Sequence, residues 1–226
     1  MIKLTKCIGL MSGTSLDGLD IAECIFWKEK NKYYYKLEKN ITKLYPERLQ
    51  NRLLNSHNLS SIDLQKLSYE FALFCGNSVK EFMKTNHIYD IEYIASHGHT
   101  VFHQPESGFS LQIGNGAVIA ATSQIKTICD FRSGDVANLG QGAPLVPIGD
   151  KLLFSEYSAC LNLGGFSNIS YDINNNRIAY DICPANIVLN HFAKYFNQEY
   201  DKNGKIAKSG ELIEELYNEL NTIEYY

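Results

Sequence analysis

The sequence predicts an α/β protein with mixed sheets, built from two similar halves. Strands and helices alternate over residues 91–130, which indicates a mixed sheet with ligand loops at the strand ends. The order strand, glycine loop, strand, turn, strand opens the chain and recurs from Ala159 to Asp181. Such a repeat suggests two half-folds that face each other across a cleft, each offering a backbone loop to one ligand such as a polyphosphate. Coincidence is the alternative, because short hairpins are common.

Composition favours a globular protein that acts on small molecules. The 226 residues leave room for one large or two small domains, with 45% hydrophobic and 20% charged residues. A net charge of −4 gives no basic surface for nucleic acid. We expect no secretory signal and no membrane span, and the six scattered cysteines, without a C-x-x-C pair, indicate buried thiols in the cytoplasm.

The stretch from Ile8 to Asp20 reads I-G-L-M-S-G-T-S-L-D-G-L-D and lies between two apolar runs. Apolar runs of this length predict strands, so the centre is expected to be a hairpin tip. Gly13 and Gly18 lack a Cβ atom, so nearby backbone N–H groups can approach an anionic oxygen closely. We therefore interpret the stretch as a phosphate-binding loop.

Hydroxyl and carboxylate groups in this stretch support that interpretation. Thr14 and Ser15 add donors, and Asp17 or Asp20 suits a Mg²⁺ held through water beside the phosphate. The simpler alternative is a glycine-containing hairpin turn with Asp as a turn former. Two glycines, two hydroxyls and two carboxylates within eight residues favour the functional interpretation.

The next elements follow from hydrophobic periodicity and turn residues. We expect a strand at 33–38, helices at 46–57 and 61–85, strands at 91–96 and 109–113, a helix through 117–120 and a strand at 126–130. The long helix carries an apolar stripe expected of scaffold packed on a sheet, formed by Leu64, Leu67, Phe71, Phe74, Cys75, Val79 and Phe82.

A long irregular passage at 131–147 is interpreted as the crossing between domains and part of the cleft floor. The expected domains are therefore 1–135 and 136–226. In the second, we expect strands at 159–163, 166–171 and 177–181, followed by a helix from about residue 187.

Asp181 is expected to close a strand, because Pro184 cannot continue a strand ladder. A carboxylate at that sheet edge can act as a general base. The alternative is a helix-capping or turn aspartate.

Three histidines, His97, His99 and His103, form a second candidate group. A His-x-His pair with later carboxylates can hold a catalytic metal. Gly98 and Pro105 favour a loop instead, in which the histidines bond a polar substrate or have a structural role. We favour this second interpretation.

Arg132 lies between Asp130 and Asp135. Its guanidinium could bind a carboxylate or phosphate of a substrate. An internal ion pair with either aspartate is an equal alternative.

Several strings, in order, resemble the anhydro-N-acetylmuramic acid kinases, which belong to the superfamily of sugar kinases, heat-shock ATPases and actin. The strings are M-S-G-T-S-L-D-G-L-D at 11–20, S-H-G-H-T-V-F-H at 96–103, Q-I-G-N at 112–115, D-F-R at 130–132, G-Q-G-A-P-L-V-P at 140–147 and L-N-L-G-G-F-S-N-I-S at 161–170. The resemblance implies an actin-like ATPase fold (ribonuclease H-like) with duplicated domains and a cleft between them.

The resemblance also implies a reaction. Members of this family use ATP and Mg²⁺ to open the 1,6-anhydro ring of anhydro-N-acetylmuramic acid with water while phosphorylating O6. The product, N-acetylmuramic acid 6-phosphate, belongs to peptidoglycan recycling and amino-sugar catabolism. Related kinases resemble dimers, which suggests a homodimer.

Site residues are implied position by position. ATP phosphates would contact the first loop, formed by Gly13, Thr14, Ser15, Leu16, Asp17, Gly18, Leu19 and Asp20, and a second loop at Leu163, Gly164 and Gly165. Asp181 would be the base that activates water. The substrate contacts would be His97, Thr100, Arg132, Asn168 and Asn186.

Three departures from the family pattern stand out. His99 replaces the usual glutamine, and Cys183 and Ala185 replace glycines beside the expected base. The family's chains continue through a P-K-S-T-G-type segment and a late G-G-G motif for adenosine, so we expect a C-terminally truncated chain with an incomplete second domain. A non-catalytic sugar-binding remnant is then one alternative function, and a metal-dependent hydrolase built on His97, His99 and Asp135 is another.

Overall fold

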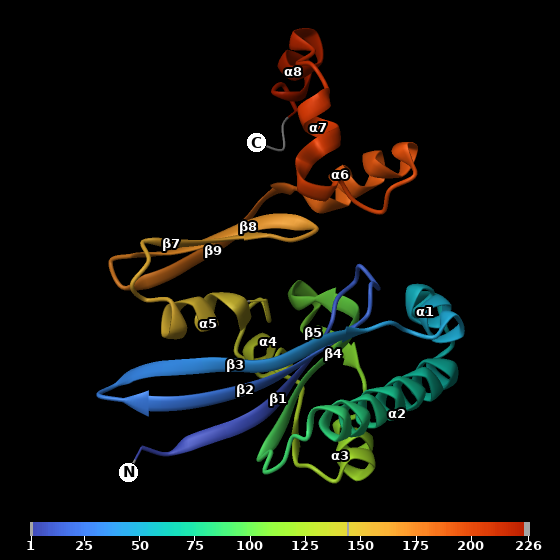
Figure 1. Cartoon of the computed structure of the whole chain (residues 1–226), viewed down its shortest axis with the longest axis vertical. Helices are drawn as coiled ribbons and strands as arrows, with labels where there is room; N and C mark the ends of the chain where they lie inside the picture. Colours follow the sequence, from blue (N-terminus) through green and yellow to red (C-terminus); the bar gives the residue numbers. More distant parts are fainter. Residues whose placement is uncertain (1, 144, 224–226) are drawn as a thin grey trace. The chain divides into compact units, whose positions relative to one another are not determined.

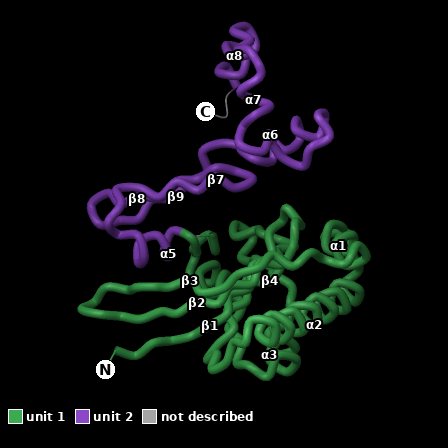
Figure 2. The backbone as a smooth tube through the Cα atoms, viewed as in Figure 1, with its two compact units in different colours: residues 1–146 green, residues 147–226 purple. Residues whose placement is uncertain are grey.

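The computed structural model describes residues 2–143 and 145–223. The chain divides into two compact units, residues 1–146 and residues 147–226, each of which is described by itself (Figure 2). Pro144, part of the string at 140–147, lies outside the described residues. None of the described helices combines the length and the apolar character needed to cross a membrane.

Unit 1 is built on a mixed six-stranded sheet (Figure 1). Its strands are β1 (Leu4–Ser12), β2 (Leu19–Glu29), β3 (Lys32–Lys43), β4 (Tyr93–Gln104), β5 (Phe109–Ile113) and β6 (Thr127–Ile128). The order is β3-β2-β1-β4-β5, and β6 also pairs with β4. β1 runs antiparallel to β2 and parallel to β4, so the mixed sheet expected from the sequence is confirmed.

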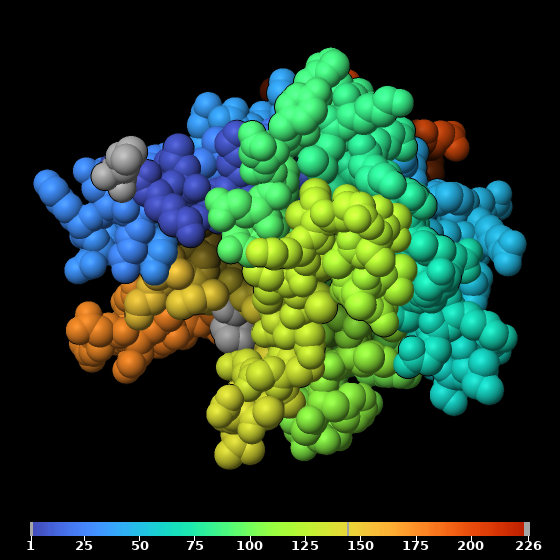
Figure 3. All heavy atoms as spheres, turned by 90° about the horizontal axis from the view of Figure 1, so that it is seen from below, coloured from blue at the N-terminus to red at the C-terminus, as the bar shows by residue number. Residues whose placement is uncertain are grey.

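Helices cover this sheet and complete the core of unit 1. They are α1 (Glu47–Leu54), η1 (Ser56–Asn58), α2 (Ser61–Asn86), η2 (Pro105–Ser107), α3 (Gly116–Ser123) and α4 (Ser133–Ala137). The apolar stripe of α2 is buried against strand residues such as Ile8 and Ile94, and Phe71 at its centre is fully buried. α2 also contacts α3, and these segments form much of the face of unit 1 seen in Figure 3.

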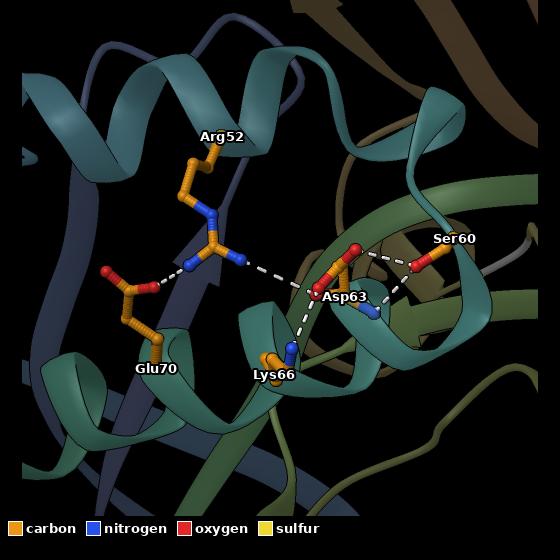
Figure 4. A network of polar contacts seen from close by, with 5 residues as sticks. All are labelled: Arg52, Ser60, Asp63, Lys66 and Glu70. Carbon is orange, nitrogen blue, oxygen red and sulfur yellow. Dashed lines mark hydrogen bonds and ion pairs between the residues drawn. The ribbon is translucent and has the colours of Figure 1, made fainter.

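Polar contacts fix α1 against α2 (Figure 4). Arg52 on α1 forms an ion pair with Glu70 on α2, and its second terminal nitrogen lies 3.5 Å from the Asp63 carbonyl oxygen. The N-cap of α2 is Ser60, whose hydroxyl oxygen accepts the Asp63 N–H at 3.2 Å. These contacts give α1 a defined position against α2.

Unit 2 holds a three-stranded antiparallel sheet in the order β7-β8-β9. The sheet follows α5 (Leu145–Leu153), a helix that begins at the end of unit 1. The other elements of unit 2 are β7 (Ala159–Leu163), β8 (Phe166–Ile173), β9 (Asn176–Pro184), α6 (Asn186–Ala193), η3 (Lys194–Phe196), η4 (Lys202–Gly204), α7 (Lys205–Ser209) and α8 (Glu214–Leu220). The order of strands and glycine turn expected at 159–181 is confirmed.

Two expectations for unit 1 are wrong. β4 continues through Gln104, so residues 97–104 belong to a strand rather than a loop, because residues 99–104 pair along β5. The strand is nevertheless irregular at two places: Gly98 has φ of +77°, and the register with β5 shifts between Thr100 and Phe102. The passage at 131–147 is also less irregular than expected, because it contains α4 and the start of α5.

The expected end of β9 is also wrong. The strand runs three residues past Asp181 to Pro184, which pairs with Phe166. β9 is an edge strand, where proline is tolerated because one side of the strand carries no ladder bonds. Asp181 therefore lies within an edge strand rather than at its end.

Candidate active site

The loop between β1 and β2 makes a tight turn whose backbone requires glycine at its end. The Leu16 N–H donates to the Gly13 carbonyl at 3.3 Å, and Leu16 has φ of +57°. Gly18 has φ of +151°, and a Cβ atom there would lie 2.9 Å from the Lys43 carbonyl oxygen. Gly18 thus allows β2 to start in close contact with the end of β3.

The side chains of this loop divide into buried anchors and exposed polar groups. Leu16 and Leu19 are buried, whereas Thr14 is exposed. The exposed Ser15 hydroxyl donates to a carboxylate oxygen of the exposed Asp17 at 2.9 Å.

The two carboxylates of the loop have the chemistry that a hydrated Mg²⁺ needs. Asp20 is exposed and accepts a hydrogen bond from Thr42, as Asp17 does from Ser15. A carboxylate accepts about four hydrogen bonds, so each one keeps acceptor capacity for a water of the ion. The donor set therefore fits the expected ion.

A chain of buried polar groups connects this loop to β4. Ser12 at the end of β1 lies opposite His99, and the Ser12 hydroxyl oxygen is 2.9 Å from His99 Nδ1. Tyr45 places its hydroxyl 2.8 Å from the Ser12 hydroxyl and 2.8 Å from the Gly18 carbonyl. Burial lowers the pKa of His99 to about 4, so this imidazole is neutral near pH 7.

His97 and Arg132 come together beside this chain of groups. Arg132 Nε and Nη2 lie 3.1 and 2.8 Å from His97 Nε2, and Arg132 Nη1 donates to the Gly142 carbonyl at 2.6 Å. The other ring nitrogen of His97, Nδ1, lies 3.0 Å from the Gly98 carbonyl. Burial, followed by the nearby Arg132 charge, lowers the pKa of His97, which suits an imidazole that accepts from the guanidinium at Nε2.

Arg132 therefore binds these neutral partners and does not form the internal ion pair with Asp130 or Asp135 that the sequence left open. The Asp135 carboxylate accepts the Gly142 N–H at 2.7 Å, and the Asp130 carboxylate accepts the Ser133 N–H at 3.3 Å. Three of the five guanidinium N–H groups are used by His97 and Gly142, so the remaining donors can bind an anionic ligand.

A polar cavity of about 220 Å³ lies at this place in unit 1. Its lining includes Ser96, His97, Gln112, Asn115, Asp130 and Ser133. Thr100 and Arg132, also expected to bind substrate, do not line this cavity, but each contacts a residue that does: the Thr100 hydroxyl oxygen is 3.4 Å from Gln112 Nε2, and Arg132 binds His97. Hydroxyl, amide and carboxylate groups of this kind can hydrogen-bond a small polyhydroxylated ligand.

The metal-dependent hydrolase alternative has no support in this geometry. His97 is engaged by Arg132, His99 by Ser12, and Asp135 by Gly142. Within the described ranges 2–143 and 145–223, no group of three His, Cys, Asp or Glu side chains is arranged to hold a metal ion.

The remaining residues that the sequence predicts to belong to the site lie in unit 2, near one end of its sheet. Asn168 in β8 lies opposite the exposed Asp181 in β9. The turn at Gly164 and Gly165 is bonded to the start of α6: the Gly164 carbonyl accepts the Asn186 N–H at 3.1 Å, and Asn186 Nδ2 donates to the Leu163 carbonyl at 2.9 Å.

The two residues that replace glycines also lie in this region. Cys183 continues β9 and places its sulfur 3.1 Å from the Ser167 hydroxyl, while Ala185 precedes α6 with φ of −124°. Neither position has the positive φ that favours glycine, but the ψ of −101° at Ala185 lies outside both the α and the β regions.

Three residues around the first loop were not expected as site residues: Ser12, Tyr45 and Gln50. Ser12 lies inside the first matched string, so its neighbourhood was a usable signal. Tyr45 and Gln50 lie outside every string, and their contacts with the loop depend on the placement of α1 and of the connection before it.

Comparison with known proteins identifies the family. The model of the anhydro-N-acetylmuramic acid kinase family matches residues 5–226. Proteins named anhydro-N-acetylmuramic acid kinase are similar to this chain: one from Francisella tularensis subsp. novicida is 38% identical over 97% of this chain and 62% of its own length. One from Hydrogenovibrio crunogenus is 35% identical over 97% of this chain and 61% of its own length. One from Clostridioides difficile is 36% identical over 96% of this chain and 62% of its own length. This chain thus spans about three fifths of the length of these curated relatives. A match along nearly the whole chain, over both units, means that it belongs to the anhydro-N-acetylmuramic acid kinase family.

Proposed function

We propose that this chain carries out, or forms the larger part of a protein that carries out, ATP-dependent hydrolytic opening of 1,6-anhydro-N-acetylmuramic acid with phosphorylation of O6. Family membership supports the reaction class. The structural observation that carries the proposal is the pairing of Ser12 with His99, because it brings the phosphate-loop string and the S-H-G-H-T string side by side, where the parallel pairing of β1 with β4 ends. Ligands of open α/β sheets bind at the carboxyl ends of parallel strands.

In unit 1, the Gly13–Asp20 loop would bind the ATP phosphates, and the cavity beside His97 would bind the sugar. The unused donors of Arg132 would bind the carboxylate of the muramic acid side chain. Thr100 would contact the sugar from the same strand as His97. Mg²⁺ held through water by Asp17 or Asp20 would neutralise phosphate charge.

In unit 2, Asp181 is the proposed general base. It would take a proton from water as the water oxygen bonds to the anomeric carbon and the bond from that carbon to O6 breaks. O6 would take the γ-phosphoryl group as the bond to the ADP oxygen breaks, giving N-acetylmuramic acid 6-phosphate and ADP. Asn168 and Asn186 would orient the sugar, and the Leu163–Gly165 turn would contact phosphate.

The proposal includes an arrangement of the whole protein. Two actin-like domains, 1–135 and 136–226, would face each other across the cleft in which this reaction occurs. The three-strand layouts that contain the two glycine turns, β1-β2-β3 and β7-β8-β9, support this duplication. A homodimer in the cytoplasm belongs to the same proposal, and the six free cysteines are compatible with a reducing compartment. The expectation that these thiols are buried is wrong for most of them, because only Cys75 is buried, four are partly buried and Cys129 is exposed.

The test is ADP release by the 226-residue chain with MgATP and 1,6-anhydro-N-acetylmuramic acid, beside an Asp181→Asn control. Turnover that is lost in the control would support the kinase function. Saturable sugar binding without turnover would instead indicate a substrate-holding portion that needs further residues. Absence of both sugar binding and turnover would contradict the proposal.

A further inference from the structure

Two side chains outside every matched string hold the backbone of the Gly13–Asp20 loop. Gln50 on α1 donates from Nε2 to the Leu16 carbonyl at 2.8 Å. Tyr45, which precedes α1, has its hydroxyl 2.8 Å from the Gly18 carbonyl. Both contacts fix carbonyl groups, yet a phosphate is bound by N–H groups, so their effect on phosphate binding is indirect.

Peptide planarity explains how a fixed carbonyl orients a donor. In a trans peptide the C=O and N–H groups point in opposite directions. Because Gln50 holds the Leu16 carbonyl, the N–H of Asp17 in the same peptide points away from α1. A backbone N–H presented in this way at a turn is the donor that an anion needs.

The directions of the hydrogen bonds among the buried polar groups explain how Tyr45 connects the two ends of the loop. The Gly18 carbonyl can only accept, so it takes the single phenol proton. The phenol oxygen then accepts from the Ser12 hydroxyl, whose oxygen accepts Nδ1–H of His99. Ser12 and Gly18 flank the turn, so Tyr45 connects its two ends.

The Tyr45 side chain and the helix that carries the exposed Gln50 are themselves held in place. Tyr45 is buried, and its ring lies 5.6 Å from the Phe74 ring and 6.3 Å from the Phe71 ring, measured between centroids. Burial raises the pKa of Tyr45 to about 12, so the phenol keeps its proton. Gln50 is on α1, which the Arg52 ion pair joins to α2 (Figure 4).

We propose that Gln50 and Tyr45 are positioning residues that hold the Gly13–Asp20 loop in its phosphate-binding conformation, an inference that rests on the proposed kinase function. Gln50 would aim the Asp17 N–H, and Tyr45 would keep the two ends of the turn together. Neither would touch the phosphate.

The experiment compares Tyr45→Phe and Gln50→Leu with wild type and with Gln50→Lys, which keeps a long donor side chain. Gln65→Leu removes an exposed glutamine from α2 and serves as the matched control. Binding of MgATP, of inorganic tripolyphosphate and of the anhydro sugar is measured by calorimetry on the full chain, with thermal melting of each variant.

We expect Tyr45→Phe and Gln50→Leu each to weaken tripolyphosphate and MgATP binding about fivefold to tenfold, the effect of losing one hydrogen bond. Sugar affinity should stay within about twofold, and Gln65→Leu should bind like wild type. Gln50→Lys, which restores a donor, should bind tripolyphosphate and MgATP more tightly than Gln50→Leu does. Because Tyr45→Phe keeps the packed ring, a phosphate-selective loss would not reflect unfolding.

The outcomes separate this inference from the proposed function. If wild type binds tripolyphosphate and both variants bind it equally well, the positioning role is wrong while the kinase proposal stands. Equal losses of sugar and phosphate affinity would likewise overturn the positioning role, because they indicate general destabilisation. If wild type binds neither MgATP nor tripolyphosphate, the phosphate loop itself is wrong, and this inference fails with it.

Discussion

Ser12 and His99 are separated by 87 positions in the sequence, yet the Ser12 hydroxyl oxygen and His99 Nδ1 are 2.9 Å apart, where the end of β1 pairs with the middle of the parallel strand β4. The contact places the Gly13–Asp20 loop beside the strand that carries His97. Two neighbouring strands, β1 and β4, therefore lead into both a candidate phosphate loop and a candidate sugar pocket.

His99 should make stability depend on pH. Its pKa is about 4 in the folded chain because of burial, against an ordinary value of 6.5. Between these values the unfolded chain binds a proton that the folded chain does not, so stability is complete above pH 6.5 and falls toward pH 4, by at most about 1.4 kcal/mol per pH unit.

His99→Gln tests this expectation. Glutamine has an N–H donor for Ser12 but does not titrate, so the free energy of unfolding should lose this part of its pH dependence. Denaturant unfolding at pH 4.5 and pH 7.5 measures the difference. His57→Gln, at an exposed histidine, is the control, and identical pH profiles for wild type and His99→Gln would contradict the assignment.

Asp181→Asn should reduce turnover about 10²- to 10⁴-fold, because an amide cannot take the proton of water. Sugar affinity should change little, since asparagine keeps the size and one acceptor. Steady-state ADP release and sugar calorimetry measure the two effects. Asp172→Asn, in the neighbouring strand β8, should keep normal turnover, and a near-normal rate in Asp181→Asn would remove Asp181 as the base.

Gly18→Ala should destabilise the chain by about 3 kcal/mol, because a positive φ and a backbone clash act together. The new Cβ atom would lie 2.9 Å from the Lys43 carbonyl oxygen. Gly108 also has a positive φ, +82°, but has open space around it, so Gly108→Ala should cost only about 1 kcal/mol. Chemical denaturation of both variants measures the difference, and equal losses would show that the close approach at Gly18 is unimportant.

Arg132→Ala should weaken binding of the anhydro sugar about 10- to 100-fold, through loss of hydrogen bonds from a charged donor. MgATP affinity should remain close to that of wild type, because the Arg132 contacts are with His97 and Gly142 rather than with the Gly13–Asp20 loop. Arg48→Ala, at an exposed arginine of α1, is the matched control. Unchanged sugar affinity in Arg132→Ala would leave Arg132 a structural role only.

The elements with strong local patterns were predictable. The stripe of α2 and its Ser60 cap determine that helix, and the apolar runs beside Gly13 determine the first hairpin. β4 was predicted too short because Gly98 and the histidines indicate a loop locally, whereas pairing with β5 satisfies their backbone groups in a strand. β9 was cut short for a related reason, since Pro184 is excluded from a central strand but tolerated at an edge.

The sequence alone determined the α/β class, the glycine turns and the family strings, because each depends on residues close together in the chain. Only the tertiary structure decided that Arg132 binds His97 rather than an aspartate, and that Tyr45 and Gln50 hold the first loop. These contacts depend on strand register and on the position of α1 against α2. Neither has a local signal, because a register is selected by the packing of a whole sheet face.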